Sequence, residues 1–343
     1  MKLIIGTIFS FFIFTISWLT PVETVSKVKP SDKVSEVLFK LGDKQPNHFL
    51  RFPSNKDIEL GRRLFHDGFA LGRNGKKAKR VSKHFVCTSC HNAEKEQKDL
   101  SQNDAQKRLD YAVKHDIPFL QGSSMYGAIN RVSFYNGDYF KKYGELVYPA
   151  RENLREAIQL CAIECAQGRR LKKWEINAIL AYLWSIGLKI EDLNLDKKEL
   201  TDLGIALLDS NKSADAIALI KSRYMDHYPA TFTKPPEDRK AGYPEVGKPD
   251  NGQRIYEQSC LHCHEEGQYS FFKLDHSENS FEFLYKHIDT YHRYSVYQVA
   301  RYGTQPVPGK KSYMPQYTQE KMSDQQMEDL RAYLKQKSAY FKK

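Results

Sequence analysis

Two short motifs of the same form, "CTSCH" at residues 87–91 and "CLHCH" at residues 260–264, decide how this chain folds. Each has two cysteines three positions apart and a histidine directly after the second. Such spacing suits covalent attachment of haem, because two thiols can add to its two vinyl groups while the histidine binds the iron. We therefore predict two covalently bound haem c groups. Their expected protein ligands are Cys87, Cys90 and His91 for the first haem, and Cys260, Cys263 and His264 for the second.

Two other kinds of site use similar residues. A structural zinc ion requires four nitrogen or sulfur ligands closed around it. A thioredoxin-like redox pair requires only the two cysteines. Neither interpretation explains why the histidine recurs after both cysteine pairs, so haem attachment is favoured.

The sequence around the two motifs also repeats. "DIELGRRLF" (57–65) precedes the first motif and "DNGQRIY" (250–256) the second, and both contain Gly-x-x-apolar-aromatic within a predicted helix. "WEINAILAYLWSIG" (174–187) and "SDQQMEDLRAYLKQ" (323–336) follow them as predicted amphipathic helices, and Ser323 with Gln326 reads as a capping box. This layout resembles class I cytochrome c domains, in which the first and last helices cross beside the haem. The resemblance implies a mainly α-helical chain with two tandem class I cytochrome c domains.

The predicted organisation has four parts. Residues 1–26 are a signal peptide, 40–195 a first cytochrome c domain with a His/Cys haem, and 247–343 a second with a His/Met haem. Residues 196–246 connect them, with a possible helix pair at 196–226 followed by a linker rich in proline and glycine.

The N-terminus predicts export. The uncharged apolar run "LIIGTIFSFFIFTISWL" at residues 3–19 follows a lysine and precedes a polar segment that contains Pro21. We expect a periplasmic protein. The alternative is a retained membrane anchor, because the run approaches the roughly 20 residues that span a bilayer.

The chain is strongly basic, with a formal net charge of +11. One basic cluster, "GRNGKKAKRVSK" at residues 72–83, has the glycines and serine of a surface loop. Such a cluster is either a solvated face or a means of attracting a small anion or an acidic redox partner, such as another cytochrome. We expect no nucleic-acid partner for an exported chain.

The second axial ligand of each haem iron determines its potential and its chemistry. For the second haem we predict Met314, which precedes Pro315 in a loop ahead of the last helix, where class I cytochromes present a methionine. Met322 and Met327 are expected to be packing residues. The rival ligands are histidines expected on the surface or on helices, namely His262, His276, His287 and His292.

The first domain offers cysteine instead of methionine. "LREAIQLCAIECAQGRRL" (154–171) is predicted to be helical, which places Cys161 and Cys165 on one face with Cβ atoms about 5 to 6 Å apart. A disulfide requires about 3.8 Å. A strained disulfide and a pair of inert buried thiols remain open, beside a thiolate that binds the iron of the first haem.

The same segment, with the helix that follows, resembles two-haem thiosulfate dehydrogenases and, more distantly, SoxA-type cytochromes. Ile158, Cys161, Gly168 and the helix around residues 178–182 match that pattern, whereas the family's arginine four positions before the cysteine is Ala157 here. The resemblance covers mainly residues 57–190 and implies that Cys161 is both a haem ligand and a catalytic participant.

It also implies oxidation of a small sulfur anion such as thiosulfate, with electrons passing from the first haem to the second and then to an external acceptor. Two alternatives remain. One is an electron-transfer cytochrome without a substrate of its own. The other is a two-haem cytochrome c peroxidase, which "ELGRRLFHDGFAL" (59–71) resembles, although "FYNGDYFKKYG" (134–144) lacks the aromatic-Asp-Gly-Arg stretch of that family.

Overall fold

The computed structural model describes residues 28–50, 53–71, 75, 79–267, 269–305 and 313–342. These residues are mainly helical, as predicted, and their β-contacts are two isolated bridges, Lys33 with Lys189 and Leu100 with Tyr224. The predicted signal peptide lies outside the described residues. None of the described helices combines the length and the apolar character needed to cross a bilayer.

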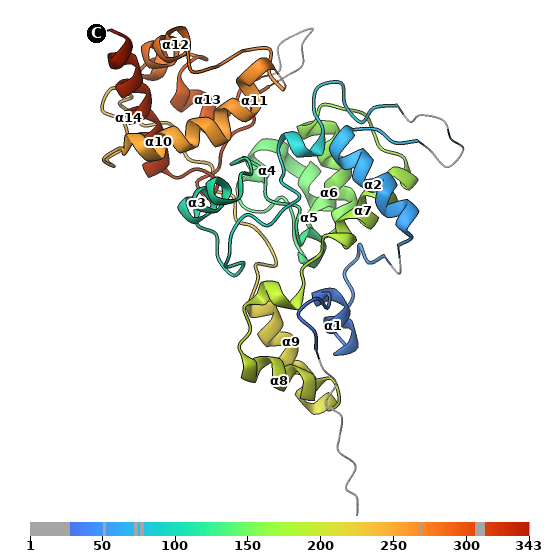
Figure 1. Ribbon diagram of the computed structural model, residues 1–343. Helices are drawn as coiled ribbons and strands as arrows, with labels where there is room; N and C mark the ends of the chain where they lie inside the picture. Colours follow the sequence, from blue (N-terminus) through green and yellow to red (C-terminus); the bar gives the residue numbers. More distant parts are fainter. Residues whose placement is uncertain are drawn as a thin grey trace, which may run out of the picture.

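The helices form three groups along the molecule (Figure 1). The middle group comprises α2 (Asn55–Asp67), α4 (Tyr139–Tyr143), α5 (Val147–Arg151), α6 (Leu154–Leu160) and α7 (Lys173–Ser185). At one end lie α10 (Pro249–Ile255), α11 (His262–His264), α12 (Glu278–Ile288), α13 (Val296–Tyr302) and α14 (Asp324–Phe341). At the other end lie α1 (Val34–Lys40), α8 (Lys197–Ala206) and α9 (Ser213–Ser222).

The described residues also contain one further helix and several short helical turns. Helix α3 (Ala105–His115) contacts α10 and so lies between the middle and C-terminal groups. Two π-helical turns span Cys161–Cys165 and Tyr256–Leu261. The 3₁₀ turns are Cys87–Ser89, Ala128–Asn130, Gly144–Leu146, Ile190–Leu193, Ser210–Lys212 and Glu265–Gly267.

Helices α2 and α7 cross at a glycine in the middle group. A Cβ atom on Gly61 would lie 1.8 Å from the carbonyl oxygen of Ala178 and 2.9 Å from the Cβ atom of Tyr182. Only glycine permits the two backbones to approach this closely. The next turn of α2 adds Phe65, whose ring centre is 5.4 Å from that of Tyr182.

Helices α10 and α14 make the same contact in the C-terminal group. A Cβ atom on Gly252 would lie 1.9 Å from the carbonyl oxygen of Asp329 and 2.8 Å from the Cβ atom of Tyr333. Tyr256 takes the place of Phe65, with its ring centre 5.8 Å from that of Tyr333. The repeated sequence pattern thus corresponds to a repeated helix crossing.

The start of α14 confirms the predicted capping box. Ser323 Oγ accepts a hydrogen bond from the backbone N–H of Gln326, and the Gln326 side chain accepts one from the backbone N–H of Ser323. These two backbone N–H groups have no backbone acceptor at the start of the helix, so the side chains supply one for each. Met322 and Met327 are buried beside this turn, as expected of packing residues.

The predicted helix pair at 196–226 is present as α8 and α9, and it packs into a third hydrophobic core. That core also contains α1, which precedes the predicted start of the first domain at residue 40. The core contains Val34 of α1, Leu188, Leu203 of α8 and Ile220 of α9. Residues 223–248 contain no helix.

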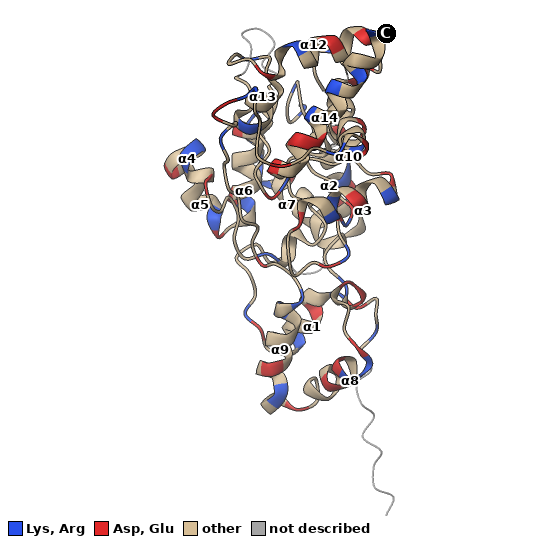
Figure 2. Ribbon diagram, turned by 90° about the vertical axis from the view of Figure 1, so that its left-hand side faces the viewer, with Lys and Arg blue, Asp and Glu red and all other residues tan. Residues whose placement is uncertain are grey.

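Charged side chains are distributed over all three groups in the described part of the chain (Figure 2). Of the basic cluster, Arg73, Lys76 and Lys77 lie outside the described residues. Lys79, Arg80 and Lys83 are exposed, consistent with a surface segment.

Candidate haem sites

The first motif forms a tight turn that directs its histidine toward a backbone carbonyl. The N–H groups of Cys90 and His91 both donate to the carbonyl of Cys87, at 3.2 and 3.0 Å. His91 Nδ1 donates to the carbonyl of Ser123 at 2.7 Å, which leaves Nε2 with a free lone pair. Gly122 permits this contact, because a Cβ there would lie 2.5 Å from His91 Nδ1. His91 Nε2 is therefore available to bind a haem iron.

The second motif orients its histidine in the same manner. Cys260 lies in the π-helical turn Tyr256–Leu261, and His264 ends α11. His264 Nδ1 donates to the carbonyl of Phe272 at 2.7 Å, so Nε2 is again available to a metal. Burial lowers the pKa of His264, and likewise that of His91, which favours the neutral imidazole that a metal requires.

Met314 lies in a loop held against the end of α13. Its N–H donates to Thr304 Oγ1 at 2.7 Å, and its carbonyl accepts from the N–H of Thr304 at 2.9 Å. Gly303 has a left-handed φ of 68°, and a Cβ there would lie 2.6 Å from the Met314 carbonyl oxygen. The Met314 side chain packs partly buried against the C-terminal core.

Cys161 and Cys165 lie near the first motif, although their local structure differs from the prediction. The predicted helix over 154–171 is wrong in its second half. Helix α6 ends at Leu160, the π-turn Cys161–Cys165 follows, and the chain then leaves the helix. The N–H of Ala166 donates to the carbonyl of Cys161 at 2.8 Å, the i to i+5 bond of a π-turn, a form that often occurs at functional sites.

Both cysteines are free thiols and share a hydrogen bond between their side chains. This bond raises the pKa of Cys161, as do burial and the nearby thiols of Cys165, Cys87 and Cys90. The same bond lowers the pKa of Cys165. Cys165 is therefore the acceptor of the pair, a role that the sequence did not suggest.

Residues 247–334 match the family model described as cytochrome c oxidase, cbb3-type, subunit III. This segment is a cytochrome c domain. Such a domain carries covalently bound haem c and transfers electrons to redox partners. Comparison of the chain with curated proteins and with solved structures gave no match.

Two tyrosine hydroxyls are directed at Cys165. Those of Tyr135 and Tyr143 lie 3.6 and 3.4 Å from its Sγ atom. With Tyr139 they form an aromatic cluster whose ring centres are 5.5 to 6.2 Å apart. Tyr135 has a left-handed φ of 52°, which costs a residue with a Cβ about 1–2 kcal/mol. Such strain is tolerated at functional sites.

Lys142 places a positive charge beside this cluster. Its helix, α4, has a basic end (Figure 2). The Nζ atom lies 5.6 Å from the ring centre of Tyr143 and donates to Gln316 Oε1 at 3.2 Å. Lys142 is exposed to solvent, but the desolvation of its amine beside the cluster lowers its pKa, while the negative charge of Cys165 acts in the opposite direction. The ammonium and the thiolate are therefore close enough to interact.

The cytochrome c domain contributes Tyr313 to the same cluster. The Tyr313 ring centre is 5.7 Å from that of Phe85 and 5.9 Å from Lys142 Nζ. Its pKa is raised by burial and by the charges of Cys165, Cys90 and Cys161. Because Tyr313 precedes Met314, one short loop reaches from the C-terminal group to the two cysteines.

The two Cys-x-x-Cys-His motifs also lie near one another. The His262 ring is hydrogen-bonded to the backbone of Thr88, and burial and Cys263 both raise the pKa of Cys90. The N–H of Phe119 donates to the carbonyl of Gln258 at 2.8 Å, which fixes this contact. Of the other rival histidines, His276 and His292 are exposed, and His287 Nδ1 is bonded to the carbonyl of Phe283 in its own helix.

The sequence analysis missed the tyrosines, although a signal was present. Tyr135, Tyr139 and Tyr143 recur every four residues in the stretch considered only as a failed peroxidase motif. That spacing gathers Tyr139 and Tyr143 on one face of α4, whereas Tyr135 precedes the helix in a left-handed conformation that the spacing does not indicate. No comparable pattern points to Tyr313, because its contacts depend on how the C-terminal group packs.

Proposed function

We propose that this chain is an exported, periplasmic two-haem c-type cytochrome, built of two tandem cytochrome c domains, that oxidises a small sulfur anion such as thiosulfate. The second domain is a cytochrome c domain, and the middle group repeats its helix crossing and its histidine geometry. Cys87, Cys90 and His91 would hold the first haem, with Cys161 as the second axial ligand. Cys260, Cys263, His264 and Met314 would hold the second.

The observation that carries this proposal is the set of side chains that surround Cys161 and Cys165. A thiol pair, two tyrosine hydroxyls and an ammonium group gather beside the first motif. Lys142 supplies a charge that attracts an anion, and the hydroxyls can hold anionic oxygen or sulfur. A plain electron carrier has no need of this arrangement.

The proposed reaction joins two thiosulfate ions into one tetrathionate ion and releases two electrons. In this step Cys165 takes the proton of Cys161, the Cys161 thiolate bonds to the outer sulfur of the first ion as two electrons leave, and the outer sulfur of the second ion then displaces Cys161 and lets the proton return. The thiol pair is thereby restored, and no proton is gained or lost. Haems held by Cys87, Cys90 and His91 and by Cys260, Cys263 and His264 would supply the electron acceptors, first and second in the path to an external redox protein such as another cytochrome.

The cofactor count follows from the two motifs. Pyridine haemochrome analysis of the isolated chain should find two haems per polypeptide, because each motif supplies two thiols for thioether bonds and one histidine. Replacing both cysteines of either motif by alanine should reduce the count to one. A wild-type count near one would show that only one motif binds haem, which would contradict the proposed reaction.

Thiosulfate oxidation tests the function directly. With thiosulfate and a one-electron acceptor, the chain should form tetrathionate, and Lys142→Gln should raise KM about tenfold at low salt, because one charge facing a dianion contributes about 1.4 kcal/mol. Lys141→Gln is the matched control. Its ammonium is exposed and paired with Asp138 at 2.8 Å, so it should leave KM unchanged.

The alternatives predict other outcomes in the same assays. A chain that is reduced and oxidised by partner proteins but forms no tetrathionate is an electron-transfer cytochrome. Turnover of hydrogen peroxide with a reduced partner identifies a two-haem peroxidase. Equal KM values for Lys142→Gln and Lys141→Gln would show that Lys142 does not recruit the substrate.

A further inference from the structure

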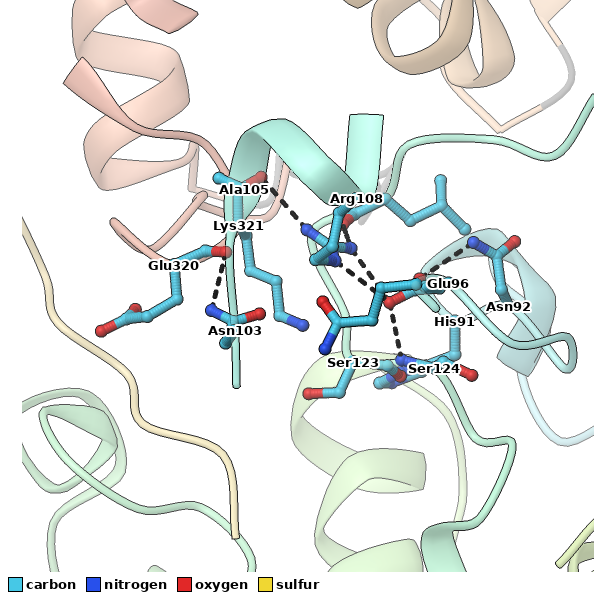
Figure 3. Close-up of polar contacts among 12 residues, drawn as sticks. His91, Asn92, Glu96, Asn103, Ala105, Arg108, Ser123, Ser124, Glu320 and Lys321 are labelled. Atoms are coloured by element: carbon cyan, nitrogen blue, oxygen red, sulfur yellow. Dashed lines mark hydrogen bonds and ion pairs between the residues drawn. The ribbon is translucent and has the colours of Figure 1, made fainter. Parts of the chain in front are cut away.

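A single peptide group connects His91 to a buried carboxylate (Figure 3). The carbonyl of Ser123 accepts the Nδ1 proton of His91 at 2.7 Å. The N–H at the other end of that peptide belongs to Ser124 and donates to Glu96 Oε2 at 3.2 Å. His91 and Glu96 are therefore bonded to opposite ends of one amide.

The environment of Glu96 favours its charged form. Arg108 Nη2 lies 3.1 Å from Glu96 Oε2, and Asn92 Nδ2 donates to Oε1 at 2.9 Å. Burial alone would favour the neutral acid, but Arg108 and Lys321 hold the pKa of Glu96 below its ordinary value. The carboxylate, the guanidinium and their partners are all buried.

The cytochrome c domain completes this charged cluster. Arg108 Nη1 donates to the carbonyl of Lys321 at 3.3 Å. The Lys321 side chain is 4 % exposed, and among the described residues its amino group has no hydrogen-bond acceptor. Burial and the nearby Arg108 charge hold the pKa of Lys321 well below its ordinary value. The Lys321 Nζ atom lies 4.8 Å from the ring centre of Tyr228.

Hydrogen bonds in series strengthen one another. A carboxylate that accepts the Ser124 N–H draws electron density toward the Ser123 carbonyl oxygen, which then accepts more strongly from His91. The imidazole gains imidazolate character and becomes a better electron donor to a metal. Partners of this kind, beyond the direct ligands, tune ligand basicity and redox potential.

We propose that Glu96 is a positioning residue that lowers the potential of the first haem through the Ser123–Ser124 peptide. This inference rests on the proposed function only in requiring a haem at the first motif. The Glu96 carboxylate would thus influence the potential of the first haem alone. The cytochrome c domain would take part through Lys321, whose carbonyl accepts a hydrogen bond from Arg108.

We call the path from Glu96 through the Ser123–Ser124 peptide to His91 the relay. Two substitutions distinguish it from a general effect of charge on the haem potential. Glu96→Gln removes the charge, whereas Glu96→Asp keeps it but withdraws it from the Ser124 N–H by one methylene group. At a fixed ambient potential, Glu96→Gln should increase the ratio of reduced to oxidised first haem at least tenfold, which equals about 59 mV for one electron. Glu96→Asp should change the ratio in the same direction by a smaller factor. The second haem should not respond.

Glu94→Gln is the matched control, because it removes an exposed carboxylate from the same loop. The NMR resonance of the His91 Nδ1 proton provides a second readout, and it should move in both Glu96 variants but not in Glu94→Gln. An unmoved potential in both Glu96 variants, or a moved potential with an unmoved His91 resonance, would overturn the relay. The haem count of each sample distinguishes this failure from loss of the first haem, which would remove the proposed function as well.

Discussion

Replacing Cys161 by alanine is expected to reduce thiosulfate oxidation by a factor of at least about 10³, because the proposed sulfur bond has no other thiolate in the ligand position. The low-spin spectrum of the first haem should change as well. The second haem should keep its spectrum, since its predicted ligands, His264 and Met314, lie in the other domain. Visible and electron paramagnetic resonance spectra, recorded with tetrathionate formation on one sample, check both expectations.

Cys165→Ala is the natural comparison, and the structure changes what it should do. Cys165 accepts from Tyr135, Tyr143 and the other thiol, so its loss disturbs the sulfur environment of Cys161. We expect a fall of about 10- to 100-fold, the usual effect of losing a partner of a metal ligand. Equal, complete loss from both substitutions would favour a disulfide, and the reverse order would assign the ligand to Cys165.

The double variant Tyr135→Phe and Tyr143→Phe is a control that tests the tyrosine hydroxyls alone. It leaves the rings that pack in the cluster but removes the donors to Cys165. If the hydroxyls act mainly on Cys165, this variant should resemble Cys165→Ala in rate while the spectrum of the first haem remains that of a thiolate ligand.

The local parts of this fold could be predicted because they depend on spacing. Gly61 and Gly252 mark helix crossings, since a Cβ at either position would collide with a facing backbone. The capping box at Ser323 depends on residues three apart. Such features need no knowledge of how distant segments pack.

The π-turn and the cluster around Glu96 could not be predicted in this way. A π-turn differs from an α-turn by one hydrogen-bond register, and nothing in "QLCAIECAQ" specifies that register. Glu96 is one acid in an irregular loop. Its partners Arg108 and Lys321 are joined by a hydrogen bond, although they are 213 positions apart in the sequence. Only the packing of the C-terminal group against α3 brings them together.

The potentials of the two haems are expected to be well separated. A thiolate donates electron density to iron and favours the ferric state, whereas a thioether favours the ferrous state. The first site, with Cys161 and the Glu96 relay, should therefore titrate low, and the second, with Met314, should titrate high. Electrons released at Cys161 would then move downhill toward the cytochrome c domain, whose motif contacts the first through Thr88 and His262.

Met314→Lys tests this ordering, because an amine replaces the thioether in the same loop. The upper wave of a potentiometric titration should fall by on the order of 0.2 V, part of the roughly 0.8 V that axial ligands span. The lower wave should stay in place. Met327→Leu, which alters a buried packing methionine of α14, should move neither wave. If the upper potential instead changes in Cys161→Ala and stays the same in Met314→Lys, the two ligand assignments are exchanged. Electrons could then not run downhill from Cys161 to the external acceptor.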